Sequence, residues 1–97
     1  MTDLPTILVI DDEIRSLESL ERILCEDFEV RTAATIPEAN AILEQDWVQL
    51  VLCDQRMPEQ SGVEFLKSVR QRWPDIIRMI VSGYTDAHDI IDGINEA

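Results

Sequence analysis

The chain has 97 residues, which is enough for one domain with a single core. Twenty acidic residues stand against eight basic ones, and the resulting net charge of -12 argues against direct binding to nucleic acid or to an anionic membrane. No segment is long and apolar enough to span a membrane, and the first residues lack the regions of a signal peptide. We therefore expect a cytoplasmic domain that covers residues 1–97.

Short apolar runs alternate with segments of helical periodicity from the first strand onward. Residues 6–10 predict a buried strand, and the spacing of apolar residues over about 14–25 predicts a helix. The apolar face of this helix is expected to carry Leu17, Leu20, Ile23 and Leu24. Residues 29–33 alternate in polarity and predict a second, shorter strand.

A helix-start signal follows the second strand. The stretch Thr35-Ile36-Pro37-Glu38 has the pattern of a capping box with proline in the first turn, so it predicts a second helix. The apolar face of that helix is expected to carry Ala39, Ile42 and Leu43. The apolar run at residues 50–53 then predicts a third buried strand, which ends at Asp54.

The second half of the chain repeats the same alternation. A loop is predicted at residues 55–62, and helical spacing then continues until Pro74. The face of this third helix is expected to carry Val63, Leu66, Val69, Arg70 and Trp73. Residues 76–81 predict a fourth strand, and a last helix is expected from about Asp86. Four strands alternating with four helices predict an α/β fold with a parallel sheet and helices on both faces.

Three acids follow two of the predicted strands. Asp11 and Asp12 come directly after the first strand, and Asp54 ends the third. Parallel strands bring their carboxyl ends to one edge of the sheet, which is where open α/β sheets bind ligands. Like charges about 4 Å apart repel by roughly 4 kcal/mol at an effective dielectric near 20, so the cluster calls for a cation or a proton. Hard oxygen ligands in a small site indicate Mg²⁺.

Cysteine and tryptophan residues are expected to have structural roles. Cys25 and Cys53 lack CxxC spacing, and we expect both to be buried free thiols in a reducing cytoplasm. Trp47 and Trp73 lie near predicted helix ends, where packing at the edge of the core is the simplest interpretation.

Four motifs occur together at the ends of the predicted strands and in the loop after the third. They are the pair Asp11-Asp12, Asp54 within Cys53-Asp54-Gln55-Arg56-Met57-Pro58, Gly62 eight residues after Asp54, and Ser82-Gly83 after the fourth strand. With these motifs the whole chain resembles the receiver domain of bacterial two-component response regulators. Two further stretches resemble those of receivers that are fused to ATPase-type transcription activators or HD-type phosphohydrolases. They are Arg72-Trp73-Pro74 and Ser82-Gly83-Tyr84-Thr85-Asp86.

The resemblance implies a flavodoxin-like, doubly wound sheet with strand order 2-1-3-4-5. This chain supplies strands for the order 2-1-3-4 only, and the fifth strand, the Lys that follows it and the fifth helix are missing from the sequence. We therefore expect a C-terminally incomplete receiver over residues 1–97, a fragment of a longer regulator. Residues 76–81 would then form an apolar edge, which predicts self-association.

The resemblance also implies a chemistry. Asp54 would accept a phosphoryl group from the phosphohistidine of a sensor histidine kinase. Asp11, Asp12, Asp54 and the backbone carbonyl of Arg56 would bind Mg²⁺, and the hydroxyl of Ser82 would contact the bound phosphoryl group. The domain would thus be a signalling phosphoacceptor that assists its own phosphorylation and dephosphorylation, rather than an enzyme with free substrates. It would switch an output domain or a partner.

Two other functions stay open beside this one. A receiver-like interaction module without efficient phosphorylation would agree with the missing Lys, although the intact acids argue against it. An aspartyl-nucleophile phosphatase would generally carry a second acid two residues after the nucleophile, where this chain has Arg56.

Individual residues have simpler interpretations as well. Asp11 or Asp12 could cap the first helix, because aspartate is favoured at that position. Asp54 could begin an ordinary turn, and Ser82 could belong to one. His88, the single histidine, is most simply a solvated surface residue.

Overall fold

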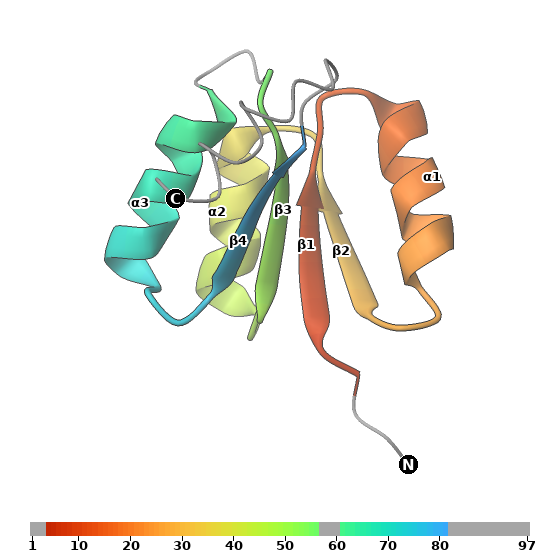
Figure 1. The fold of residues 1–97 in the computed structure, drawn as a ribbon, viewed down its shortest axis with the longest axis horizontal. Helices are drawn as coiled ribbons and strands as arrows, with labels where there is room; N and C mark the ends of the chain where they lie inside the picture. Colours follow the sequence, from red (N-terminus) through yellow and green to blue (C-terminus); the bar gives the residue numbers. More distant parts are fainter. Residues whose placement is uncertain (1–3, 57–60, 82–97) are drawn as a thin grey trace.

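The computed structural model describes residues 4–56 and 61–81, which form four strands and three helices (Figure 1). The strands are β1 (Thr6–Ile10), β2 (Glu29–Ala33), β3 (Leu50–Asp54) and β4 (Ile77–Val81). The helices are α1 (Ile14–Leu24), α2 (Ile36–Gln45) and α3 (Gly62–Arg72). The predicted last helix, from about Asp86, lies outside the described residues. Among the described residues, no helix combines the length and apolar character needed to cross a membrane.

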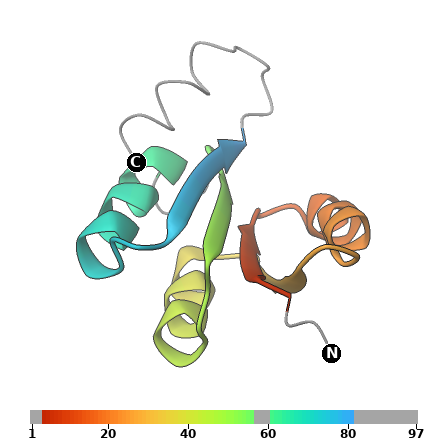
Figure 2. The ribbon, with the colours of Figure 1, turned by 60° about the horizontal axis from the view of Figure 1, so that its bottom comes forward.

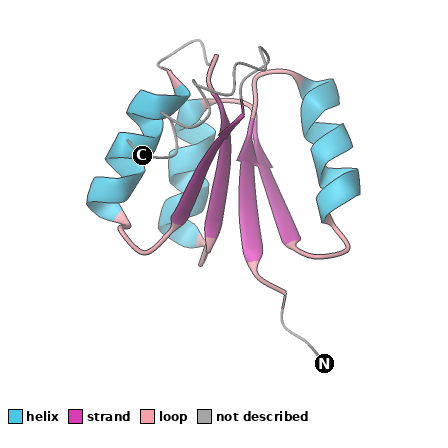
Figure 3. Ribbon diagram, in the orientation of Figure 1, coloured by secondary structure: helices cyan, strands magenta, loops and turns pink. Residues whose placement is uncertain are grey.

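The four strands form one parallel sheet in the order β2-β1-β3-β4, as predicted. Helix α1 covers one face of the sheet, and α2 and α3 cover the other (Figures 2 and 3). The prediction of a doubly wound α/β fold is confirmed for this part of the chain. The register between the central strands pairs Ile10 with Cys53, so that β1 and β3 end at the same edge of the sheet.

Two apolar clusters hold the layers together. The larger one lies between the sheet and the α2–α3 layer, and its fully buried members include Leu8, Val51 and Phe65. The smaller one lies under α1 and contains Ile7, Val9 and Leu17. Burial of apolar surface on both faces of β1 and β3 explains why these strands have nearly continuous runs of Val, Ile and Leu.

The buried face of α3 differs from the predicted one. Its buried residues are Gly62, Phe65, Leu66 and Val69. Arg70 is exposed, whereas Val63 and Trp73 are partly buried and pack against the larger core cluster, as expected of Trp73 at the edge of the core. The prediction was right for Leu66 and Val69, wrong for Arg70, and missed Phe65. Gly62, expected to close the preceding loop, is the first residue of the helix.

Three side chains that were expected in or beside the core are exposed. Ile23 is exposed because it lies about 100° around α1 from Leu24, away from the sheet. Cys25 is exposed because it follows the last residue of α1, so the prediction of a buried thiol is wrong for this residue. Trp47 lies in the connection between α2 and β3 and is 83% exposed, so it does not pack at the core edge. Cys53, in contrast, is buried as a free thiol.

The predicted start of α2 is confirmed in its hydrogen bonds. The Thr35 hydroxyl accepts a hydrogen bond from the Glu38 N–H at 3.2 Å. The Glu38 carboxylate in turn accepts one from the Ala34 N–H at 3.3 Å, one residue before the position expected of a capping box. These bonds satisfy free backbone donors at the helix start.

Candidate functional site

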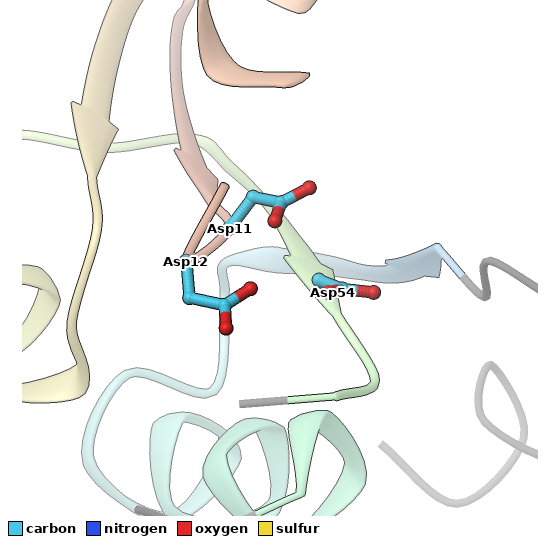
Figure 4. Close-up of side chains that lie close together, drawn as sticks. All are labelled: Asp11, Asp12 and Asp54. Carbon is cyan, nitrogen blue, oxygen red and sulfur yellow. The ribbon is translucent and has the colours of Figure 1, made fainter. Parts of the chain in front are cut away.

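Three carboxylates meet at the carboxyl edge of the sheet. Asp11 and Asp12 follow β1, and Asp54 is the last residue of β3 (Figure 4). Each aspartate offers one oxygen, and these three oxygens lie within 4.8 Å of one another. The shared end of β1 and β3 produces this proximity, because the parallel pairing sets Ile10 beside Cys53 one residue before the acids. The structure therefore brings together the three acids that the sequence singled out.

Asp11 has a second contact that fixes its orientation. Its Oδ1 accepts a hydrogen bond from the Glu13 N–H at 2.9 Å, and its own N–H donates to the Ala33 carbonyl at 3.1 Å. The N-cap of α1 is Glu13, so neither Asp11 nor Asp12 occupies the capping position itself. Asp11 thus supports the start of α1 and also belongs to the acid cluster.

Both partly buried acids have unfavourable surroundings as carboxylates. Burial raises the pKa of Asp54, and the charge of Asp12 raises it further. Burial also raises the pKa of Asp11, with additional contributions from Asp54 and Asp12. Backbone N–H groups oppose these effects: Glu13 lowers the pKa of Asp11, and Arg56 and Gln55 lower that of Asp54. A cation beside the cluster would relieve the remaining repulsion.

The donor set fits a small hard cation. All three ligating groups are carboxylates, and Asp12 is exposed, so water can reach the site and complete a coordination shell. Mg²⁺ takes one or two carboxylates and keeps several waters, which this open edge permits. The neighbouring thiol does not compete as a ligand. Burial, followed by the charges of Asp54 and Asp11, raises the pKa of Cys53 to about 12, so it stays protonated at neutral pH.

Gly62 allows α3 to approach the acid at the end of β3. A Cβ atom on Gly62 would lie 2.6 Å from the Asp54 carbonyl oxygen and 3.0 Å from the Gln55 Cα. These are backbone atoms that cannot turn aside, so any side chain here would force the start of α3 away from Asp54. The spacing of Asp54 and Gly62, noted in the sequence as a motif, thus has a steric reason.

The remaining predicted site residues lie beside the cluster or outside the described part. Arg56 is exposed and follows Asp54 by two residues. Ser82 lies outside the described residues, as does the Met57-Pro58 pair. One residue with contacts at the site was missed: the Gln55 side chain accepts a hydrogen bond from the Val63 N–H at 3.1 Å. A single polar residue after an aspartate carries no sequence signal for such a contact.

A cavity of about 740 Å³ lies at the other end of the strands and contains none of the three acids. It lies between the ends of α2 and α3 and the starts of β3 and β4, and Trp47 and Trp73 contribute to its wall. The chemistry of the domain is therefore expected at the carboxyl edge, where the titratable groups converge, and not in this cavity.

The fold and the acid cluster define a doubly wound α/β domain with a site for a cation at the carboxyl edge of its parallel sheet. Residues 7–97 match the response regulator receiver domain family, and the chain belongs to that family. The resemblance inferred from the Asp11-Asp12, Asp54 and Ser82-Gly83 motifs is thereby confirmed. The chain is a receiver domain of the kind found in two-component response regulators, a class of domains that typically bind Mg²⁺.

Relatives and solved structures agree with this assignment. The chain is 56% identical over 92 residues to the hydrogenase transcriptional regulatory protein HoxA of Cupriavidus necator. It is 58% identical over 92 residues to HoxA of Bradyrhizobium diazoefficiens. Each match covers 95% of this chain but 19% of the relative. A receiver domain protein (CheY-like) from Methanospirillum hungatei has a TM-score of 0.83 at 32% identity, over 97% of this chain and 76% of that one.

Proposed function

We propose that this receiver domain accepts a phosphoryl group on the Asp54 carboxylate, with Mg²⁺ bound beside it. The observation that carries the proposal is the convergence of three carboxylate oxygens within 4.8 Å at the ends of β1 and β3. Asp54 and one of the pair Asp11 and Asp12 would bind the ion directly, the other of the pair would bind it through water, and the backbone carbonyl of Arg56 would be a further ligand. Mg²⁺ would neutralise charge on the transferring phosphoryl oxygens.

The transfer itself is a displacement at phosphorus. An Asp54 oxygen attacks the phosphorus of a phosphohistidine, the new P–O bond forms as the P–N bond breaks, and the product is an acyl phosphate. The imidazole nitrogen leaves with the electron pair and takes up a proton. The Arg56 N–H, which lowers the pKa of Asp54, would help to hold its carboxylate in place. The hydroxyl of Ser82 would donate to the bound phosphoryl group and report its presence to the residues that follow.

The partners follow from the family. A sensor histidine kinase would supply the phosphoryl group, and an output domain elsewhere in the regulator would respond. HoxA, which is 56% identical to this chain, is a transcriptional regulatory protein, and this favours a transcription activator over an HD-type phosphohydrolase as the output. We place the domain in the cytoplasm, and we infer that it assists its own phosphorylation and dephosphorylation without turning over free substrates.

Intact mass spectrometry tests the proposal. The chain is incubated with Mg²⁺ and acetyl phosphate, a small phosphodonor, and we expect a gain of one phosphoryl group. The gain should disappear in Asp54→Asn and without Mg²⁺, and it should persist in Asp27→Asn, which removes an exposed acid outside the cluster. A chain that gains nothing under these conditions would instead favour the interaction module.

A further inference from the structure

Gln55, the residue directly after the proposed phosphoacceptor, links three elements. Its backbone N–H donates to the Val81 carbonyl at the end of β4, at 2.9 Å. Its backbone carbonyl accepts from the Gly62 N–H at 3.0 Å, and its side-chain Oε1 accepts from the Val63 N–H at 3.1 Å. One partly buried residue thus connects the end of β3 with β4 and with the start of α3.

The contact between α3 and the end of β3 is close enough to transmit small displacements. Gly62 approaches the Asp54 carbonyl so closely that there is no room for a Cβ atom. Arg56 and Ser61 form an antiparallel bridge across the same loop. Because these contacts involve backbone atoms on both sides, a shift of the first turn of α3 would shift the peptides on either side of Gln55.

Those peptides orient the phosphoacceptor. The Gln55 carbonyl and the Arg56 N–H belong to one planar peptide unit, so they point in fixed and opposite directions. Gly62 binds the carbonyl side, and the N–H side stabilises the Asp54 carboxylate. The direction in which Asp54 presents its oxygens therefore depends on where the start of α3 lies.

We propose that Gln55 is a positioning residue for phosphoryl transfer. Its side chain fastens the first turn of α3, through Val63, to the peptide that orients Asp54 for Mg²⁺ and for the phosphodonor. The inference rests on the proposed function, because it concerns the same site. It extends that function to a residue that touches neither the ion nor the phosphoryl group and acts through Asp54.

Simple helix capping is the alternative, and the chain offers a matched control for it. The N-cap of α3 is Ser61, whose hydroxyl accepts a hydrogen bond from the Glu64 N–H at 3.2 Å. Ser61→Ala and Gln55→Met each remove one side-chain acceptor from the first turn of α3. Only Gln55→Met also removes a side-chain link between the first turn of α3 and the residue whose peptides lie beside Asp54. Methionine matches glutamine in length but does not supply the amide oxygen.

The test is a Mg²⁺ titration of the 97-residue chain, followed by NMR through the backbone amides of residues 11, 12 and 54–56. We expect Gln55→Met to weaken Mg²⁺ binding about tenfold, the effect typical of a lost contact behind a metal ligand. Ser61→Ala should stay within about twofold of the wild type, although both variants should lose similar stability to urea. Gln55→Glu keeps an acceptor for Val63 and should keep the wild-type affinity or exceed it.

The outcomes separate this inference from the proposed function. Equal Mg²⁺ affinities for Gln55→Met and Ser61→Ala would reduce Gln55 to a helix cap. A loss of affinity in Gln55→Glu would overturn the inference even if Gln55→Met does not fold. If the wild type and Gln55→Met bind Mg²⁺ and gain a phosphoryl group equally well, the positioning role of Gln55 is refuted. The proposed function is then supported. Wild-type protein that does neither refutes both.

Discussion

Replacing the proposed phosphoacceptor by asparagine should stabilise the metal-free domain. The Asp54→Asn substitution removes one of three acids whose oxygens lie within 4.8 Å of one another. At that separation a pair of like charges repels by about 3.5 kcal/mol at an effective dielectric of 20, and by about 0.9 kcal/mol in bulk water. Asp12 is exposed and the other two acids are only partly buried, so the lower figure applies. The substitution relieves the repulsion of Asp54 by both other acids. Asparagine accepts weaker hydrogen bonds from the neighbouring N–H groups, which offsets part of this relief. We therefore expect the free energy of unfolding to rise by about 1 kcal/mol.

The pH dependence of this gain has a definite sign. Asp54 and Asp11 have raised pKa values in the folded chain, so above those values their charges cost stability. As the pH falls through the raised values toward the ordinary 3.8, the folded state binds protons before the unfolded state does, and the wild type recovers stability. The difference in stability between Asp54→Asn and the wild type should therefore be largest near neutral pH and should become smaller at acidic pH.

Mg²⁺ should reverse the order of stability, so that the wild type becomes more stable than Asp54→Asn. A ligand that binds only the folded state, at ten times its dissociation constant, stabilises by about 1.4 kcal/mol. Asp54→Asn lacks one of the proposed Mg²⁺ ligands, so Mg²⁺ should stabilise this variant less than it stabilises the wild type. The assay is urea unfolding followed by tryptophan fluorescence, with and without Mg²⁺ and at several pH values. Asp27→Asn is the control for net charge. A metal-free Asp54→Asn variant that is less stable than the wild type, or no more stable than Asp27→Asn, would refute the electrostatic reasoning.

Two further predictions concern the packing of the sheet. Gly62→Ala should lower the free energy of unfolding by about 1–3 kcal/mol, because the added methyl group meets the Asp54 carbonyl; an unchanged urea midpoint would contradict the close approach. Met79→Lys should reduce self-association, because Ile77, Met79 and Val81 leave an exposed apolar row on β4, which pairs only with β3 within the described residues. Sedimentation velocity at several concentrations tests this, and a wild-type chain that stays monomeric throughout would contradict it.

The sequence predicted the strands well because each apolar run is short and bounded by polar residues. The bounds of β2 agree with the predicted ones, and β3 ends at Asp54 as expected. The order of the strands in the sheet was harder to predict, since periodicity alone does not decide which parallel strands are neighbours. It came from the family resemblance carried by the acids and by Ser82-Gly83. The three acids themselves could be placed together from their positions after the strands.

The errors concern how the helices and their ends lie on the sheet. Whether Ile23 or Cys25 is buried depends on the rotation of α1 and on where it ends, and a broad apolar stripe does not determine either. Phe65 was missed for the same reason on α3. The contact between Gln55 and Val63 depends on the path of the loop after β3, which no local pattern specifies.

Borohydride reduction shows whether Asp54 forms an acyl phosphate. After reaction with acetyl phosphate and Mg²⁺, an acyl phosphate is reduced to an alcohol, which leaves homoserine at the modified position. Peptide mass spectrometry then locates the change. We predict homoserine at position 54 in the wild type and nowhere else, and none without the phosphodonor. Homoserine at Asp11 or Asp12, or its absence from a chain that has gained a phosphoryl group, would contradict the assignment of Asp54 as the phosphoacceptor.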